Sequence, residues 1–179
     1  NVRDRWVYSI DARTGQVLER YNATPWDGPT TALAVDLNGA NHTLNAYAVE
    51  DSFLLIDATR PMFADVQPDV VGSPRGAIVT LTAGQQDLTR TTRIEHVVSV
   101  DNSWSDPVAV SAHINMGIVF DYFLQTHGRL SIDGVGGSMR SIIHVTDEGL
   151  PMDNAFWSGT FIAYGDGDVA FDPLAEGLD

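Results

Sequence analysis

The sequence contains neither cysteine nor lysine. Without cysteine the chain forms no disulfide and offers no thiolate for catalysis or metal binding, which leaves either redox compartment open. All ten basic residues are arginines, whereas 24 residues are acidic, so the formal net charge is -14 at pH 7. Such a surface repels phosphate backbones, and we expect no binding to nucleic acid. It suits a salt-rich environment, or calcium as a counter-charge.

Long hydrophobic runs are also scarce. The 179 residues are 44% hydrophobic with a mean hydropathy of -0.06, which is typical of a soluble globular domain. We expect no run long enough to span a bilayer, and therefore no insertion into a membrane. An initiating methionine and a signal peptide are lacking too, which places Asn1 downstream of a processing site or of a cloning boundary.

One segment of the sequence is strongly helical. Asp106 can accept hydrogen bonds from the N–H groups of a first helical turn, and Pro107 suits the first helical position. Gly128 can take the left-handed conformation that ends a helix, so we predict a helix over residues 107–127. Apolar residues recur along it at three- and four-residue steps and also occupy the flanking side. We expect this helix to be buried on most sides.

Strand patterns surround this helix. Alternating, β-branched and aromatic residues predict strands at 31–37, 42–49, 53–57, 76–82, 91–100, 138–145 and 155–164, the last interrupted by a turn at Ser158-Gly159. Residues 6–10 and 16–21 predict a hairpin with Gly15 in its turn. The fold class is therefore α+β, with a twisted antiparallel-rich β-sheet and one long buried helix at about 107–127.

One strand carries a candidate binding edge. A strand through Asn154, Ala155, Phe156 and Trp157 could lie at the edge of the sheet and offer its N–H and C=O groups to an extended peptide. The plainer alternative is a hairpin that only closes the core, and the residues alone favour that alternative.

A series of motifs between residues 106 and 179 has the order found in one protease family. The motifs are Val110-Ser111-Ala112-His113, Phe120-Asp121-Tyr122-Phe123, His127-Gly128-Arg129, Ser131-Ile132-Asp133-Gly134, Met139-Arg140-Ser141, Val145, Asn154-Ala155-Phe156-Trp157-Ser158-Gly159, Tyr164-Gly165-Asp166-Gly167-Asp168 and Gly177-Leu178-Asp179. They resemble the N-terminal half of the catalytic domain of thermolysin-like neutral zinc metalloproteases. Residues 53–61 and 101–104 show a weaker similarity.

The resemblance implies a secreted or extracellular metalloendopeptidase, in which zinc-bound water attacks a peptide carbonyl. In the family, the dipeptide matching Leu178-Asp179 leads into the helix with the His-Glu-x-x-His zinc motif. None of the five histidines here lies four residues from another, so we expect structural roles for them and no zinc site. Zinc then comes only through the C-terminal half of the same protease, and this chain is inactive alone.

The alternative is a stand-alone, non-catalytic module that binds peptides or is structural. The coding sequence after Asp179 separates the two hypotheses, since His-Glu-x-x-His supports the protease and a stop codon supports the module.

The resemblance also implies a set of substrate-binding residues. Asn154 and Ala155 would bind the peptide backbone through a side-chain amide and a carbonyl, with Trp157 on the same strand. Phe171 and Leu174 would line an apolar pocket beside the scissile bond, so the partner is a peptide or protein substrate.

Calcium is a further candidate ligand, and the residues considered for it are Asp101, Asp166, Asp168 and Asp179. For the Asp166-Gly167-Asp168 segment a simple turn is the favoured interpretation. Asp179 on its own suits a helix cap or a frayed terminus.

The same resemblance divides the chain into two segments. Residues 1–24 resemble the closing hairpin of the pro-region and its junction, and 25–179 the N-terminal subdomain that ends just before the zinc helix. Both sides of the junction are present in one chain, which puts ordinary maturation by cleavage there in doubt. We expect the chain to fold without zinc and to expose an apolar face along Phe156, Phe171, Leu174 and Leu178. This face predicts self-association, a covering hairpin or capture of a complementary chain.

Overall fold

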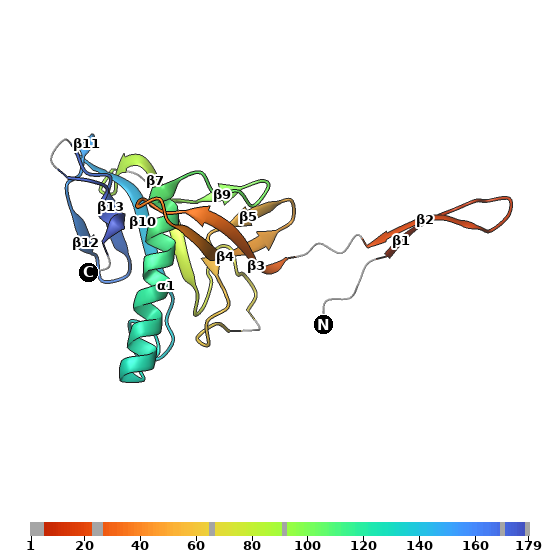
Figure 1. The fold of residues 1–179 in the computed structure, drawn as a ribbon, viewed down its shortest axis with the longest axis horizontal. Helices are drawn as coiled ribbons and strands as arrows, with labels where there is room; N and C mark the ends of the chain where they lie inside the picture. Colours follow the sequence, from red (N-terminus) through yellow and green to blue (C-terminus); the bar gives the residue numbers. More distant parts are fainter. Residues whose placement is uncertain (1–5, 23–26, 65–66, 91–92, 169–170, 178–179) are drawn as a thin grey trace.

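The computed structural model describes residues 6–22, 27–64, 67–90, 93–168 and 171–177. Two sheets pack around one long helix, and a separate hairpin lies apart from them near the N-terminus (Figure 1). The elements are β1 (Trp6–Ile10), β2 (Val17–Asn22), β3 (Gly28–Val35), β4 (Asn41–Val49), β5 (Ser52–Leu54), β6 (Ile56–Asp57), β7 (Ile78–Asp87), β8 (Glu95–His96), β9 (Val98–Ser99), α1 (Pro107–His127), β10 (Met139–Asp147), β11 (Leu150–Pro151), β12 (Ala155–Trp157), β13 (Ile162–Gly165) and the 3-10 helix η1 (Leu174–Glu176).

The larger sheet has the strand order β12-β13-β10-β7-β6, with β11 paired to β10 and β8 paired to β7. Its central strand, β10, runs parallel to β7 and β13. The smaller sheet has the order β3-β4-β5-β9 and is antiparallel throughout. The remaining pairs are antiparallel as well, so the predicted α+β class with an antiparallel-rich sheet is confirmed, although the strands are divided between two sheets.

Helix α1 begins and ends where the capping residues predict. The Asp106 carboxylate accepts hydrogen bonds from the backbone N–H groups of Val108 (3.0 Å) and Ala109 (3.3 Å). Gly128 has a φ of 61°, and its N–H donates to the carbonyl of Leu124 at 3.0 Å. Each bond satisfies a backbone group that the helix itself leaves unpaired. The bounds 107–127 are therefore confirmed.

The first half of α1 forms the centre of the protein. Residues 108–113 are all buried, and they pack with side chains from both sheets and with Tyr164. After Phe120 no residue of the helix is buried, and Tyr122 and Phe123 are exposed, so the expected burial on most sides is wrong for its last two turns. By length and apolar composition α1 would pass as a membrane span, which corrects the expectation that no run is long enough. Its burial against both sheets is that of a core helix.

The chain crosses from one sheet to the other at Leu55 and again at Val97. Residues 53–57, predicted as one strand, divide into β5 in the smaller sheet and β6 in the larger one. The segment 95–99 divides in the same way into β8 and β9, and the Leu55 N–H donates to the Val97 carbonyl. The prediction of one strand over 91–100 is therefore wrong in extent. The strand residues of each pattern continue on both sides of a single residue, Leu55 or Val97, so the local sequence does not reveal the crossing.

The hairpin β1–β2 is confirmed with the predicted turn. Gly15 has a φ of 72°, and the Arg20 guanidinium lies 5.2 Å from the centre of the Trp6 ring. Trp6, Tyr8 and Ile10 share one face of the hairpin because alternate strand residues point the same way, and all three are exposed.

Candidate functional site

Strand β12 forms one edge of the larger sheet. It pairs with β13 on one side, in the register Ala155 to Tyr164, Phe156 to Ala163 and Trp157 to Ile162. On its other side, no strand of the described residues pairs with it. Among the described residues β12 thus has the edge position that the sequence allows, and it lies at the rim of the molecule in Figure 1.

The hydrogen bonds beside β12 show which of its backbone groups face outward. The Asn154 carbonyl accepts from the Gly165 N–H at 3.0 Å, and the Ser158 N–H donates to the Phe161 carbonyl at 2.9 Å. Bonded and non-bonded residues alternate along an antiparallel pair, so Phe156 also bonds to β13. The N–H and C=O groups of Ala155 and Trp157 therefore point to the open edge. An extended peptide could pair with them as a further strand.

Two glycines allow the turn after β13 to pack against this edge. A Cβ on Gly165 would lie 1.8 Å from the carbonyl oxygen of Met152, and a Cβ on Gly167 would lie 2.1 Å from that of Phe171. Gly167 also has a φ of 72°, and its N–H donates to the Met152 carbonyl at 3.3 Å. Both positions need glycine because other backbone atoms lie too close for a side chain. Packing therefore explains the two glycines of the Gly165-Asp166-Gly167 segment.

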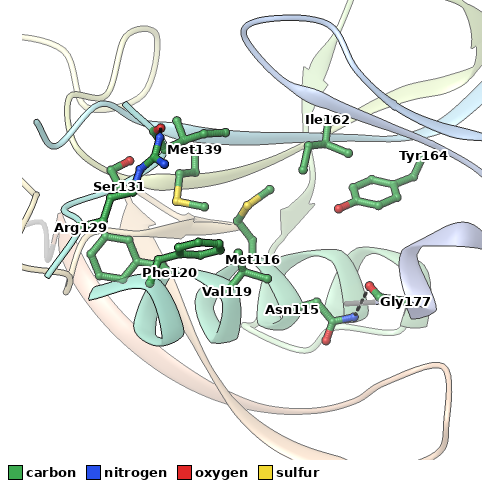
Figure 2. Close-up of a pocket in the computed structure, with 12 residues that line it drawn as sticks. Asn115, Met116, Val119, Phe120, Arg129, Ser131, Met139, Ile162, Tyr164 and Gly177 are labelled. Carbon is green, nitrogen blue, oxygen red and sulfur yellow. Dashed lines mark hydrogen bonds between the residues drawn. The ribbon is translucent and has the colours of Figure 1, made fainter. Parts of the chain in front are cut away.

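An apolar cavity of about 220 Å³ lies on the face of the larger sheet that carries α1. Figure 2 shows Met116 and Phe120 of the helix opposite Met139 and Ile162 of the sheet. At its end, the Asn115 side-chain amide donates to the carbonyls of Ala175, Glu176 and Gly177 at 3.0 to 3.2 Å. This amide fixes the path of the chain after η1.

A second cavity, of about 350 Å³, lies on the opposite face of the same edge. Asn154 and Phe156 line it, whereas Ala155 and Trp157 do not, in keeping with the alternation of side chains along a strand. Asp87, Asp147 and Asp153 contribute carboxylates to its wall. Cavities therefore lie on both faces of the sheet, the first bordered by β13 and the second by β12.

His144 links this sheet to the start of α1. Its Nε2 lies 2.8 Å from Asp106 Oδ2, and its Nδ1 lies 2.8 and 2.9 Å from the two oxygens of Asp166. Hydrogen bonds to these two carboxylates raise the pKa of His144 to about 10. The cationic imidazolium thus holds two acidic groups from distant parts of the sequence. The sequence identified Asp106 only as a cap, and nothing in the local pattern pairs it with His144.

The predicted substrate-binding residues do not all lie together. Asn154, Ala155 and Trp157 line the edge, and the side chains of Asn154 and Trp157 are exposed. Leu174 is partly buried against the core that contains α1, and Phe171 is 59% exposed. Neither Phe171 nor Leu174 lines the two cavities described above. Their role in a pocket beside a scissile bond stays a prediction.

Part of the expected apolar face is exposed. Phe156 is 40% exposed and Phe171 is 59% exposed, as the sequence predicts, while Leu174 is partly buried. Leu178 lies outside the described residues. The described parts of the chain therefore leave Phe156 and Phe171 without cover, as well as Trp157 next to Phe156.

The candidate calcium residues are engaged with other groups. Asp101 accepts from the Ser103 N–H at 3.0 Å and the Ser99 hydroxyl at 3.1 Å, and Asp166 holds His144. Asp168 hydrogen-bonds to Asp153, which helps to raise the pKa of the Asp153 carboxyl. Asp179 lies outside the described residues. Calcium binding stays a prediction.

The donor groups of the described residues do not fit a zinc site. Within the ranges that the structure describes, no three His, Cys, Asp or Glu side chains are placed to share a metal ion. Four of the five histidines make hydrogen bonds to protein groups: His42 to Asp36, His96 to the Val71 carbonyl, His113 to Thr80 and Asn45, and His144 as above. The ring of His127 instead contacts those of Tyr122 and Phe123. These contacts agree with the structural roles that the sequence predicts.

The fold and the edge define an α+β domain with a strand open to peptide pairing. Residues 31–179 match the family described as thermolysin metallopeptidase, catalytic domain. The chain therefore belongs to the thermolysin family of metallopeptidases. This confirms the resemblance of its motifs to that family.

Individual relatives are similar along almost the whole chain. Bacillolysin from Brevibacillus brevis is 33% identical over 176 residues, covering 98% of this chain and 29% of the relative. Neutral protease B from Bacillus subtilis (strain 168) is 33% identical, with 97% and 30% covered, and thermolysin from Bacillus sp. (strain EA1) is 32% identical, with 99% and 32% covered. The chain thus spans about a third of the length of these relatives.

Among solved structures, the precursor of protealysin, a metalloproteinase from Serratia proteamaculans, matches with a TM-score of 0.48 and 23% identity. The match covers 63% of this chain and 33% of that one.

Proposed function

We propose that this chain forms the N-terminal wall of the substrate cleft in a secreted zinc metalloendopeptidase. The observation that carries the proposal is the open edge of β12, where the backbone groups of Ala155 and Trp157 face outward. Backbone pairing holds a peptide of any sequence in an extended conformation, as a protease with broad substrates requires. Membership of a metallopeptidase family supplies the reaction, which is hydrolysis of a peptide bond.

In this proposal Asn154 and Ala155 hold the substrate backbone through the side-chain amide and the carbonyl group. The Asn154 side chain is exposed beside the edge, so its amide is free to meet a peptide that lies along β12. The backbone N–H and C=O groups of Trp157, two residues after Ala155 on β12, also face outward. Phe171 and Leu174 border the apolar side of the cleft. These roles bind and orient the substrate, and none of them activates water.

The C-terminal half of the same protease would supply zinc and its ligands. Zinc bound there would provide the activated water, as the family implies, and within the described residues of this chain no set of donors is placed to hold it. The apolar cavity beside α1 offers a docking surface for that half. Gly177, held by Asn115, borders this cavity (Figure 2).

Exposure of Phe156 and Phe171 favours the partial enzyme over a complete stand-alone module. A finished module would bury large aromatic side chains such as these. The hairpin β1–β2 is assigned to a pro-region with its junction in residues 1–24, and residues 25–179 to the subdomain. In Figure 1 the hairpin lies away from β12 and leaves the edge uncovered.

Amide hydrogen exchange tests the peptide-binding role. In the free chain, the N–H groups of Ala155 and Trp157 should exchange fast, while that of Phe156 is protected by β13. A saturating extended peptide should slow the first two and leave Phe156 unchanged, which makes Phe156 an internal control. If Ala155 and Trp157 stay fast in the presence of peptides that bind elsewhere, the edge is not the substrate site.

A further inference from the structure

We propose that the cavity under Asn154 and Phe156 is a subsite for an arginine or lysine side chain of the substrate peptide. This inference rests on the proposed function, because it places one side chain of a peptide that lies along β12. It adds a preference for a basic side chain in the substrate, which membership of the family does not imply.

The cavity lies where a side chain of a peptide paired with β12 would point. Its volume is about 350 Å³, and it opens on the face of β12 that carries Asn154 and Phe156. A peptide paired with the open edge directs alternate side chains to this face. Such a side chain enters the cavity without any change in the path of the peptide backbone.

The wall of the cavity combines carboxylates with apolar surface. Asp147 and Asp153 are exposed at the cavity, and within the described residues no basic side chain forms an ion pair with either. Asp87 also faces it and has an exposed partner, Arg90, at 3.8 Å. Leu88 and Met152 supply apolar surface between these carboxylates. A long aliphatic stem with a cationic head matches both kinds of surface.

Unsatisfied polar groups at the cavity point in the same direction. Thr146 lines the wall and is 7% exposed, and its buried hydroxyl has no hydrogen-bond partner among the residues that the structure describes. A buried hydroxyl without a partner costs free energy, and a ligand with several donors would satisfy it. Desolvation and the neighbouring Asp168 carboxylate raise the pKa of Asp153, because a second acidic group lies beside it.

The spacing of the carboxylates favours an organic cation over a metal ion. No three acidic or histidine side chains in the described ranges are placed to share a metal. A guanidinium spreads its charge over several N–H donors and can reach carboxylates on different sides of a cavity. The chain around the edge adds to the attraction, because residues 147–177 contain no basic residue and carry the acidic residues Asp147, Glu148, Asp153, Asp166, Asp168, Asp172 and Glu176.

A matched pair of peptides tests the subsite. Short blocked apolar peptides with a fluorescent label carry arginine at one position in turn, or citrulline, its neutral isostere, at the same position. Binding to the full chain is measured by fluorescence anisotropy at neutral pH. At one position, or at two alternate positions, the arginine peptide should bind about tenfold more tightly than the citrulline peptide, as expected of a charge-assisted hydrogen bond.

Variants assign the preference to the cavity. Asp147→Asn and Asp153→Asn, singly and together, should reduce the preference for arginine and leave the affinity for citrulline peptides unchanged. Asp51→Asn is the matched control, because it removes the same charge from the exposed turn between β4 and β5 in the other sheet. Circular dichroism verifies the fold of each variant. If the double variant unfolds, the two single variants still test the proposal.

Three outcomes would overturn the inference, and they separate it from the proposed function. Equal affinities of arginine and citrulline peptides remove the subsite and leave peptide binding at β12 intact. A preference that is the same at every position, and that Asp51→Asn lowers equally, reflects general attraction to an acidic protein and also removes the subsite. If no peptide binds and the amides of Ala155 and Trp157 do not respond, the proposed function fails and the subsite fails with it.

Discussion

The carboxylate of Asp106 joins the start of α1 to His144. Its Oδ1 accepts hydrogen bonds from the first-turn N–H groups of Val108 and Ala109, while its Oδ2 lies 2.8 Å from Nε2 of His144. Asp166, in the turn after β13, holds the other ring nitrogen. One imidazolium therefore fixes the helix start relative to the strand that pairs with β12. The position of the candidate peptide edge depends on this link.

We predict that His144 stabilises the fold at neutral pH and that this contribution is lost at high pH. The two carboxylates raise its pKa from 6.5 to about 10, so the folded state binds the proton more tightly than the unfolded state. The stabilisation is complete below pH 6.5 and disappears as the pH rises towards 10. Urea unfolding of His144→Gln should lack this alkaline loss. His127→Gln, at the exposed end of α1, is the control, and an unchanged alkaline slope in His144→Gln would contradict the assignment.

His113 should have the opposite effect, in acid. Burial lowers its pKa to about 4, and the neutral ring is held by Thr80 at Nδ1 and by the Asn45 carbonyl at Nε2, each at 2.9 Å. The unfolded state therefore binds the proton first, and stability falls as the pH drops from 6.5 to 4. A shift of this size corresponds to about 3 kcal/mol. Unfolding curves of His113→Gln should show a flatter acid limb than those of His42→Gln, whatever the overall loss of stability.

The chain alone should not hydrolyse peptides. Hydrolysis by this family needs an activated water, and the described residues contain no group of donors that could hold zinc to provide one. Purified chain incubated with casein and excess zinc should release no peptides. Activity that survives repurification and is abolished by a chelator would show that this expectation is wrong.

Replacement of Asn154 by alanine should weaken catalysis in the intact protease. The loss of a side-chain amide that binds the substrate backbone in a dehydrated cleft costs about 1 to 3 kcal/mol of transition-state stabilisation. The measurement is kcat/KM on a peptide substrate, with Asn41→Ala, an exposed asparagine on the other sheet, as the control. An unchanged kcat/KM would remove Asn154 from the substrate site.

The exposed aromatic residues predict self-association of the chain. Phe156 on the edge strand is 40% exposed and Phe171 is 59% exposed, and large exposed apolar patches are unusual on monomers. Sedimentation velocity should show a concentration-dependent dimer or larger species. Phe156→Ser with Phe171→Ser should shift this equilibrium to the monomer, whereas Leu33→Ser, an exposed leucine on β3, should not. A wild-type chain that stays monomeric at every concentration would contradict the prediction.

The sequence by itself determined the features that depend on neighbouring residues. Asp106, Pro107 and Gly128 mark the bounds of α1, because a helix cap is built from side-chain and backbone groups a few residues apart. Gly15 placed the turn of the β1–β2 hairpin for the same reason. The motif series around Asn154 identified the family, which the match over residues 31–179 confirms.

The tertiary structure decided the features that depend on residues far apart in the chain. Strand patterns do not state a partner, so the crossings at Leu55 and Val97 and the parallel pairs of β10 appear only in the fold. The contact of His144 with Asp106 joins residues 38 positions apart. The open edge of β12 and the cavities on the two faces of the sheet likewise exist only once the sheet is assembled, because each is formed by segments that the sequence keeps separate.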